Sequence, residues 1–230
     1  MAVTLVDAMG VNATTNSSIY ILTTVSFTPS AGELIIVKAV IENSQTEFDD
    51  PTTTGESITW TKQYSSRITN TCMAVIWSGI VAVGGTGVTV SIVKSSGSPS
   101  EWASMAVERW AGAQVAAAPA IGFLLGQSTT TTITTTGTGS YVSYVNGDWN
   151  AVAPGTPAYA SSAVQENIHD KSTSTYVAYY AYQAAPTAGV QTFGLTSPSS
   201  RKDTLIGIEI QAITAAAIVN RNLMTLGVGV

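Results

Sequence analysis

The chain consists largely of short runs of β-forming residues separated by turn residues. Residues 33–41 form a continuous apolar run, residues 57–64 alternate between apolar and polar, and residues 73–83 are apolar and β-branched. Gly, Pro, Ser and Asn interrupt these runs, for example at residues 28–32. Many short strands bounded by turn signals are typical of sandwiches and barrels. The sequence therefore predicts an all-β fold, an antiparallel β-sandwich that is jelly-roll-like.

Two segments allow more than one interpretation. Residues 102–110 fit either a helix that begins near Ser100 or a strand with alternating faces, and we predict a strand because the neighbouring segments are strands. The threonine run at residues 129–136 resembles a linker in composition. Thr is β-branched and favours extended structure, so we predict a strand with one polar face there.

Glycine positions suggest two tight turns. Residues 73–83 and 87–93 flank Gly84-Gly85, which predicts a hairpin. The strand at residues 141–145 is followed by Asn146-Gly147. Asn-Gly is the strongest two-residue signal for a turn, so this strand is predicted to end there.

Residues 1–214 are predicted to form a single β-sandwich domain, followed by an extended apolar C-terminal tail at residues 215–230. Residues 215–219 fit a short helix, and the rest of the tail carries almost no charge. Exposed apolar groups usually mark an interaction site. We expect the tail to bind a partner subunit, although folding back onto its own sandwich is the alternative. The residues expected to make the contact are Ile218, Leu223, Met224, Leu226 and Val228.

The scarcity of charge excludes several classes of protein. Only 10% of the 230 residues are charged, against 45% that are hydrophobic, and the net charge is −5. A spanning helix needs about 20 consecutive apolar residues, and no such run is present. The N-terminus lacks the features of a signal peptide. Arg201-Lys202 is the nearest approach to a basic patch, so we expect neither nucleic-acid binding nor membrane insertion.

Catalytic groups are few and lack partners in the sequence. Cys72 and His169 are the only residues of their types, and the carboxylates show no spacing that pairs them. Cys72 is expected to be a small buried hydrophobe, and His169 a loop residue. The acidic run Glu47-Phe48-Asp49-Asp50 supplies oxygen atoms of the kind that bind Ca²⁺, but a solvated loop is favoured. We therefore predict no enzymatic activity, no cofactor and no metal site.

Residues 139–150, Gly-Ser-Tyr-Val-Ser-Tyr-Val-Asn-Gly-Asp-Trp-Asn, resemble a strand-plus-turn motif in β-sandwich virion structural proteins of tailed bacteriophages. Residues 27–35, 184–189 and 206–210 extend the resemblance, although Gly147 separates the Asn and Asp of the motif. The resemblance implies a minor tail protein or a head decoration (accessory) protein. Such a protein is made in the host cytoplasm, is located in the virion, binds other virion proteins and assembles as a homo-oligomer.

Aromatic residues in the second half suggest an alternative function. Tyr and Trp combine a flat apolar face with a polar tip, which suits sugar-binding platforms as well as protein interiors. The residues expected to serve surface recognition are Asp148, Trp149 and Tyr159. In this alternative the protein is a glycan-binding β-sandwich module that attaches the particle to a cell surface.

Overall fold

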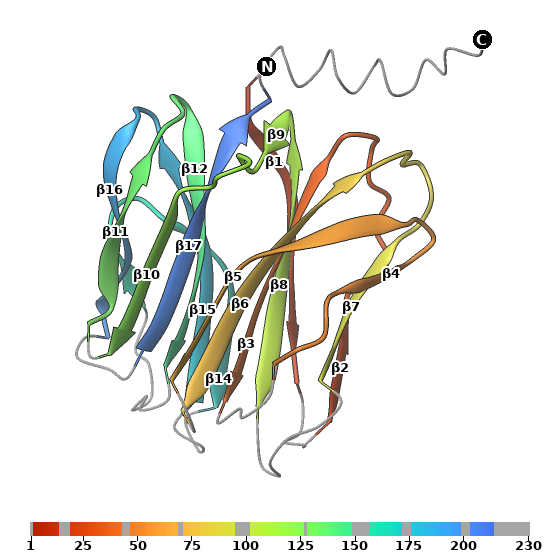
Figure 1. Ribbon diagram of the computed structural model, residues 1–230. Helices are drawn as coiled ribbons and strands as arrows, with labels where there is room; N and C mark the ends of the chain where they lie inside the picture. Colours follow the sequence, from red (N-terminus) through yellow and green to blue (C-terminus); the bar gives the residue numbers. More distant parts are fainter. Residues whose placement is uncertain are drawn as a thin grey trace.

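The computed structural model describes residues 2–13, 19–42, 47–68, 71–94, 102–126, 128–148, 157–171, 176–198 and 203–213. Within these ranges every regular element is a β-strand (Figure 1). The strands of the first half are β1 (Thr4–Asn12), β2 (Tyr20–Thr23), β3 (Leu34–Glu42), β4 (Thr52–Thr54), β5 (Ile58–Ile68), β6 (Cys72–Val81), β7 (Thr89–Lys94) and β8 (Ala103–Ala111). Those of the second half are β9 (Ala113–Gln114), β10 (Ile121–Gly126), β11 (Thr130–Thr135), β12 (Ser140–Asp148), β13 (Ala158–Tyr159), β14 (Val164–Lys171), β15 (Tyr176–Ala185), β16 (Gly189–Ser197) and β17 (Asp203–Ala212).

The strands form two large sheets and two small ones. One large sheet has the order β1-β8-β3-β6-β5, and the other has the order β10-β17-β12-β15-β14, with β9 added beside β17. The small sheets have the orders β2-β7-β4 and β11-β16-β13. Neighbouring strands in the described part of the chain pair antiparallel. The predicted all-β sandwich is confirmed.

The two halves of the chain have the same arrangement of strands. If β1 to β8 are matched in order with β10 to β17, both the large and the small sheets have identical strand orders. Each half is an eight-stranded sandwich of two sheets, as in a jelly roll. The edge strand β1 contacts β14, and the edge strand β5 contacts β10. Because β1 is equivalent to β10 and β5 to β14, these two contacts are equivalent to each other, as in a two-fold symmetric dimer. One chain therefore contains two similar sandwiches.

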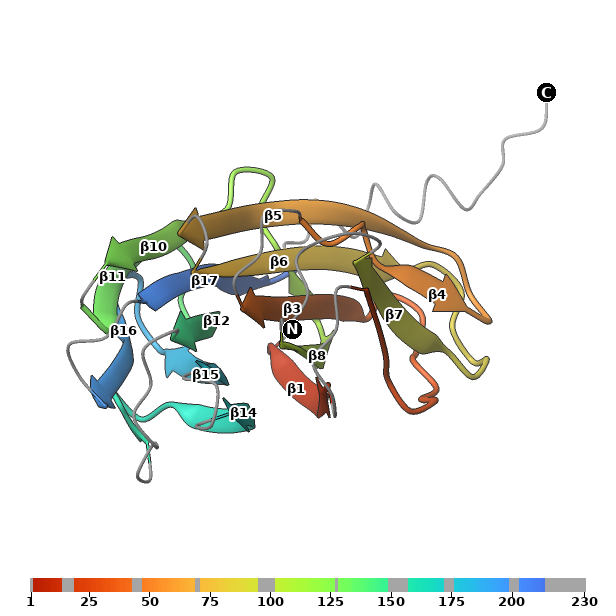
Figure 2. The same ribbon diagram turned by 90° about the horizontal axis from the view of Figure 1, so that it is seen from below.

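The four sheets lie in layers, with the two large sheets in the middle (Figure 2). The face between the large sheets is filled by residues such as Ile36, Ile76, Tyr180 and Ile208. The opposite face of the first large sheet packs on the β2-β7-β4 sheet, where Trp77 lies. A central strand buried on both faces needs apolar residues at successive positions. This explains why residues 33–41 and 73–83 are continuous apolar runs.

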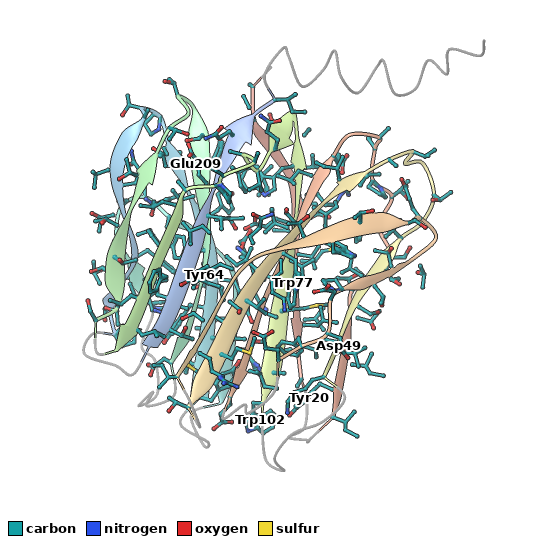
Figure 3. The ribbon with its side chains drawn as sticks, in the orientation of Figure 1. Tyr20, Asp49, Tyr64, Trp77, Trp102 and Glu209 are labelled. Atoms are coloured by element: carbon teal, nitrogen blue, oxygen red, sulfur yellow. The ribbon has the colours of Figure 1, made fainter. Side chains whose placement is uncertain are left out.

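The two large sheets are joined by an aromatic pair at one edge of their interface and by an amide pair at the other. The rings of Tyr64 on β5 and Phe123 on β10 lie 5.2 Å apart between centroids, and Tyr64 can be followed in Figure 3. At the other edge, Asn167 Nδ2 donates to Asn12 Oδ1 at 2.9 Å and to the Met105 carbonyl at 3.3 Å. Both open edges of the central interface are therefore held by specific contacts.

The strand predictions for the two ambiguous segments are confirmed. Residues 103–111 form β8, and the threonine run contains β11. Ile133 of β11 is buried, while Thr132 and Thr134 are exposed. The run therefore has the expected polar face.

Both tight-turn predictions are wrong. β6 pairs with β3 and β5, whereas β7 pairs with β2 and β4, so Gly84-Gly85 leads from one sheet to another. Asn146 and Gly147 lie inside β12 and pair with residues of both β15 and β17. Local turn propensity is overridden there because the strand continues into the core between two neighbours.

The segment at residues 215–230, including Ile218, Leu223, Met224, Leu226 and Val228, lies outside the described residues. So does Trp149. No helix in the described part of the chain is long and apolar enough to cross a membrane.

Candidate functional site

Of the proposed sugar-binding residues, the structure describes Asp148 and Tyr159, and neither is an exposed surface group. Asp148 is only 1% exposed at the end of β12, contrary to the surface position expected for it. Tyr159 on β13 is half-buried, and its hydroxyl lies 2.8 Å from Gln165 Oε1. Its ring packs edge-on against Tyr144 at 6.5 Å between centroids. Burial raises the pKa of Tyr159. The phenol therefore serves as a packed, hydrogen-bonded group.

His169 and Cys72 both lie in the interior. His169 is part of β14 rather than of a loop, and its ring packs edge-on against Trp102 and Tyr176 at 6.1 and 5.5 Å. The Cys72 thiol donates to the Gly147 carbonyl at 3.3 Å and is fully buried. The prediction that His169 is a loop residue is wrong, while the prediction of a buried Cys72 is confirmed.

The acidic run before β4 is engaged with donors from the protein. Glu47 accepts hydrogen bonds from Lys62 Nζ and Ser65 Oγ, both at 2.9 Å. The Lys62 bond is the main factor that lowers the pKa of Glu47. Asp50 accepts from Trp77 Nε1 at 2.9 Å. Nowhere in the described ranges do three His, Cys, Asp or Glu side chains form a group that could hold a metal ion.

The outward faces of the two small sheets have similar chemistry. On the β2-β7-β4 sheet, Thr23 Oγ1 lies 2.8 Å from Ser91 Oγ, and Thr54 Oγ1 lies 2.7 Å from Thr89 Oγ1. Ile21 on this face is 68% exposed. These hydroxyl groups satisfy one another across the strands. We call this surface the first end face.

The second end face is the outward side of β11 and β16. Thr132 lies opposite Thr192, and Thr134 lies opposite Val190. Val190 is 70% exposed. Among the described residues of both small sheets, none of the outward side chains is charged. The molecule therefore presents an uncharged β surface at each end of its stack of layers.

Much of the small set of charged residues lies inside the protein. In the described part of the chain the buried charged residues are Glu33, Lys38, Glu42, Lys94, Glu108, Arg109, Asp148 and Glu209, and the side chain of Glu166 is buried as well. The exposed ones that the structure describes are Asp7 on β1 and a group near β5, namely Glu47, Asp49, Asp50, Lys62 and Arg67. Most of the charged residues that the structure describes therefore contribute little charge to the surface.

A pocket of about 410 Å³, open on one side, lies beside β5 and β6 and is bounded by residues 114–117. Its lining is uncharged. The polar lining residues are Ser57, Thr59, Thr61, Gln63, Ser78 and Gln114. Hydroxyl and amide groups of this kind suit a neutral, hydroxyl-rich ligand.

A charged cluster lies between the two large sheets. Lys38 Nζ donates to Glu108 Oε1 and to Glu166 Oε2, and it also donates to the Ala181 carbonyl at 3.2 Å. Lys38 and Glu108 come from adjacent strands β3 and β8, whereas Glu166 comes from β14 in the other half. The three side chains are at most 1% exposed.

The pKa shifts in this cluster follow from burial and from the neighbouring charges. Burial alone would lower the pKa of Lys38, but Glu108 and Glu166 outweigh it and raise that pKa. Burial, and then the Glu108 charge, raise the pKa of Glu166 well above its ordinary value. The cluster therefore favours an ammonium on Lys38 and a proton on Glu166.

Sequence reasoning did not identify this cluster. The available signal was Lys38 itself, a charge in the middle of the apolar run that begins at Glu33 and ends at Ile41. A buried charge needs a partner, but the partner carboxylates lie 70 and 128 residues away.

Comparisons of the chain with models of known protein families, with curated proteins and with solved structures found no match.

Proposed function

We propose that the protein is a structural component of a tailed bacteriophage virion, a minor tail or head decoration protein that acts through protein–protein contacts. The observation that carries this proposal is the pair of uncharged end faces at opposite ends of the molecule. Burying an unpaired charge is costly, whereas burying a hydrogen-bonded hydroxyl costs much less. Two faces on opposite sides allow one subunit to contact two neighbours at once.

The proposal also agrees with the resemblance of residues 139–150 to virion proteins. The jelly-roll arrangement is used by viral capsid proteins and by lectins. Because one fold serves many functions, the fold supports the proposal only together with the end faces. In the proposed assembly, Ile218, Leu223, Met224, Leu226 and Val228 of the apolar tail add contacts to other virion proteins, and copies of the chain associate with one another.

The experiment is to place charge on the end faces. We expect the variants Val190→Glu, Thr132→Lys and Ile21→Glu to fold normally but to be lost from purified particles of the phage that encodes the chain. Thr4→Lys, at an exposed position on β1 away from both faces, is the matched control. Mass spectrometry of the particles measures incorporation, and thermal unfolding checks the fold. Absence of the unaltered chain from particles, or normal incorporation of folded end-face variants, contradicts the proposal.

The tail is tested separately by deleting residues 215–230. The truncated chain is expected to keep the cooperative unfolding of the sandwich and to lose assembly, because it lacks the apolar contact residues. Unchanged incorporation of the truncated chain would show that the tail contributes nothing to the contact.

A second candidate function is binding of a neutral glycan in the pocket beside β5 and β6. Its uncharged hydroxyl and amide lining favours this alternative. Binding of neutral oligosaccharides, measured by calorimetry, is then expected to be lost in Thr61→Val and Gln114→Leu and retained in Thr132→Val on the second end face. No heat with any neutral oligosaccharide would exclude this function for the pocket.

A further inference from the structure

The cluster of Lys38, Glu108 and Glu166 combines an amine and two carboxyl groups in a site closed to solvent. The amine nitrogen contacts an oxygen of each carboxyl group. The three residues come from both halves of the chain, so any bond between Lys38 and Glu166 would join the two large sheets. These groups are the reactants of an amide condensation.

The two carboxyl groups have different surroundings. Glu108 accepts hydrogen bonds from Ser143 Oγ and Trp110 Nε1, both at 2.7 Å, in addition to Lys38. Glu166 Oε2 contacts Lys38, but Glu166 Oε1 is buried without a hydrogen-bond partner in the described part of the chain. Hydrogen bonds stabilise the charged form of a carboxylate, and burial favours the neutral form. Glu108 is therefore held by donors beside the Lys38 nitrogen, in position to take its proton, whereas burial raises the pKa of Glu166 and favours the protonated form, which the amine can attack.

The Trp110 ring, whose Nε1 donates to Glu108, packs against two tyrosine rings. The Trp110 ring lies 4.9 Å from the Tyr141 ring and 5.6 Å from the Tyr182 ring, between centroids. A site from which water is excluded strengthens the interactions among its charged groups and suppresses hydrolysis. The fold already holds the reacting groups next to each other, so they need not meet by diffusion.

We propose that Lys38 and Glu166 form an intramolecular isopeptide bond, with Glu108 as the catalytic base and acid. Glu108 first takes a proton from the Lys38 ammonium, which leaves a neutral amine. The amine nitrogen attacks Cδ of the protonated Glu166 carboxyl group, the new C–N bond forms, and the C–OH bond breaks. Glu108 relays a proton from the nitrogen to the departing hydroxyl.

The step is balanced without an oxidant or cofactor. An ammonium, a carboxylate and a carboxylic acid become an amide, one water molecule and a protonated Glu108. Ser143 and Trp110 hold Glu108, and the Ala181 carbonyl holds the amine, so these groups position the reactants. The product covalently ties β3 of the first half to β14 of the second half.

The bond is tested by mass spectrometry of the folded full-length chain after denaturation. The mass is expected to be lower than the sequence mass by one water molecule, with any loss of Met1 determined separately at the peptide level. Trypsin is expected to leave residue 38 uncleaved, within a branched peptide that also contains Glu166. A folded wild-type chain with the full sequence mass overturns the proposal.

Two variants test the assigned roles. Lys38→Met removes the amine and Glu108→Gln removes the base, and both chains are expected to have their full sequence masses. Lys62→Met is the matched control, because Lys62 forms an exposed pair with Glu47, and it is expected to keep the water loss. Continued condensation in a folded Glu108→Gln chain would overturn the role of Glu108. The measurement needs no virion, so its result is independent of the proposed assembly function.

Discussion

Gly147 of β12 lies directly against Val40 of β3 across the interface of the two large sheets. A Cβ atom added at Gly147 would stand 2.7 Å from Val40 Cγ1. The valine side chain is stiff and fully buried, so it has little room to move. The missing side chain at residue 147 therefore permits the close approach of the two halves.

Gly147→Ala is expected to destabilise the protein by about 1–3 kcal/mol, the usual cost of overpacking a core. Urea denaturation measures the change. Gly87→Ala is the matched control, because Gly87 is exposed and its added Cβ would meet only Ser26 Oγ, at 3.0 Å. Equal stability of the two variants would show that the sheets separate freely at residue 147.

Arg109 is expected to stabilise the first half through its contacts with Glu33. Arg109 Nε and Nη2 donate to the two Glu33 oxygens at 3.0 and 3.2 Å, and Nη2 also donates to the Thr28 carbonyl at 3.0 Å. Arg109→Met leaves a buried carboxylate without its partner, which typically costs about 3–5 kcal/mol.

A double-mutant cycle measured by urea denaturation checks the Arg109 prediction. The second change, Glu33→Gln, is expected to recover part of the loss, because it removes the isolated charge. Additive effects of the two changes would show that the pair is not coupled. Arg109→Lys is also expected to be unstable, because lysine lacks the planar fork.

Glu209 is expected to make the free energy of unfolding depend on pH in the acid range. It accepts backbone hydrogen bonds from Thr136 and Gly137 at 3.0 and 2.8 Å (the residue is labelled in Figure 3). Burial alone would raise the pKa of Glu209, but these backbone bonds outweigh it and lower the pKa from 4.5. A carboxyl group whose pKa is lower in the folded than in the unfolded protein stabilises the fold at a pH above its unfolded pKa. This stabilisation is lost as the pH falls through its folded pKa.

Glu209→Gln is therefore expected to cost about 1–2 kcal/mol at neutral pH, and this difference should shrink as the pH falls below 4.5. Urea denaturation over a pH series provides the measurement. The control is Glu47→Gln, whose exposed ion pair is worth less than about 1 kcal/mol. A difference that stays constant with pH would contradict the role assigned to the Glu209 charge.

The Cys72 thiol is expected to be unreactive in the native protein. It is fully buried and donates to the Gly147 carbonyl, and buried structural cysteines are inert. A thiol reagent should label no cysteine in buffer and one per chain in denaturant. Rapid labelling in buffer would show that this part of the interface opens easily.

The sequence alone determined the fold class because strand formation leaves a local signal. Alternation, β-branched residues and turn residues predicted the strands, including those at residues 102–110 and 129–136. The continuous apolar runs at residues 33–41 and 73–83 also predicted strands, and only the structure showed that both faces of these strands are buried. These features need no knowledge of which strands become neighbours.

Only the tertiary structure decided how the strands are shared among sheets and which side chains meet. Asn146-Gly147 is locally a turn signal, but the neighbours of β12 on both sides extend the strand through it. The sequence does not reveal the duplication of the eight-stranded arrangement either. Equivalent strands need only similar patterns of burial, and these do not require the same residues. Lys38, Glu108 and Glu166 meet because packing of the large sheets places three distant strands around one point. Which side chains meet across a sandwich depends on strand order and register, and a single sequence does not state either of them directly.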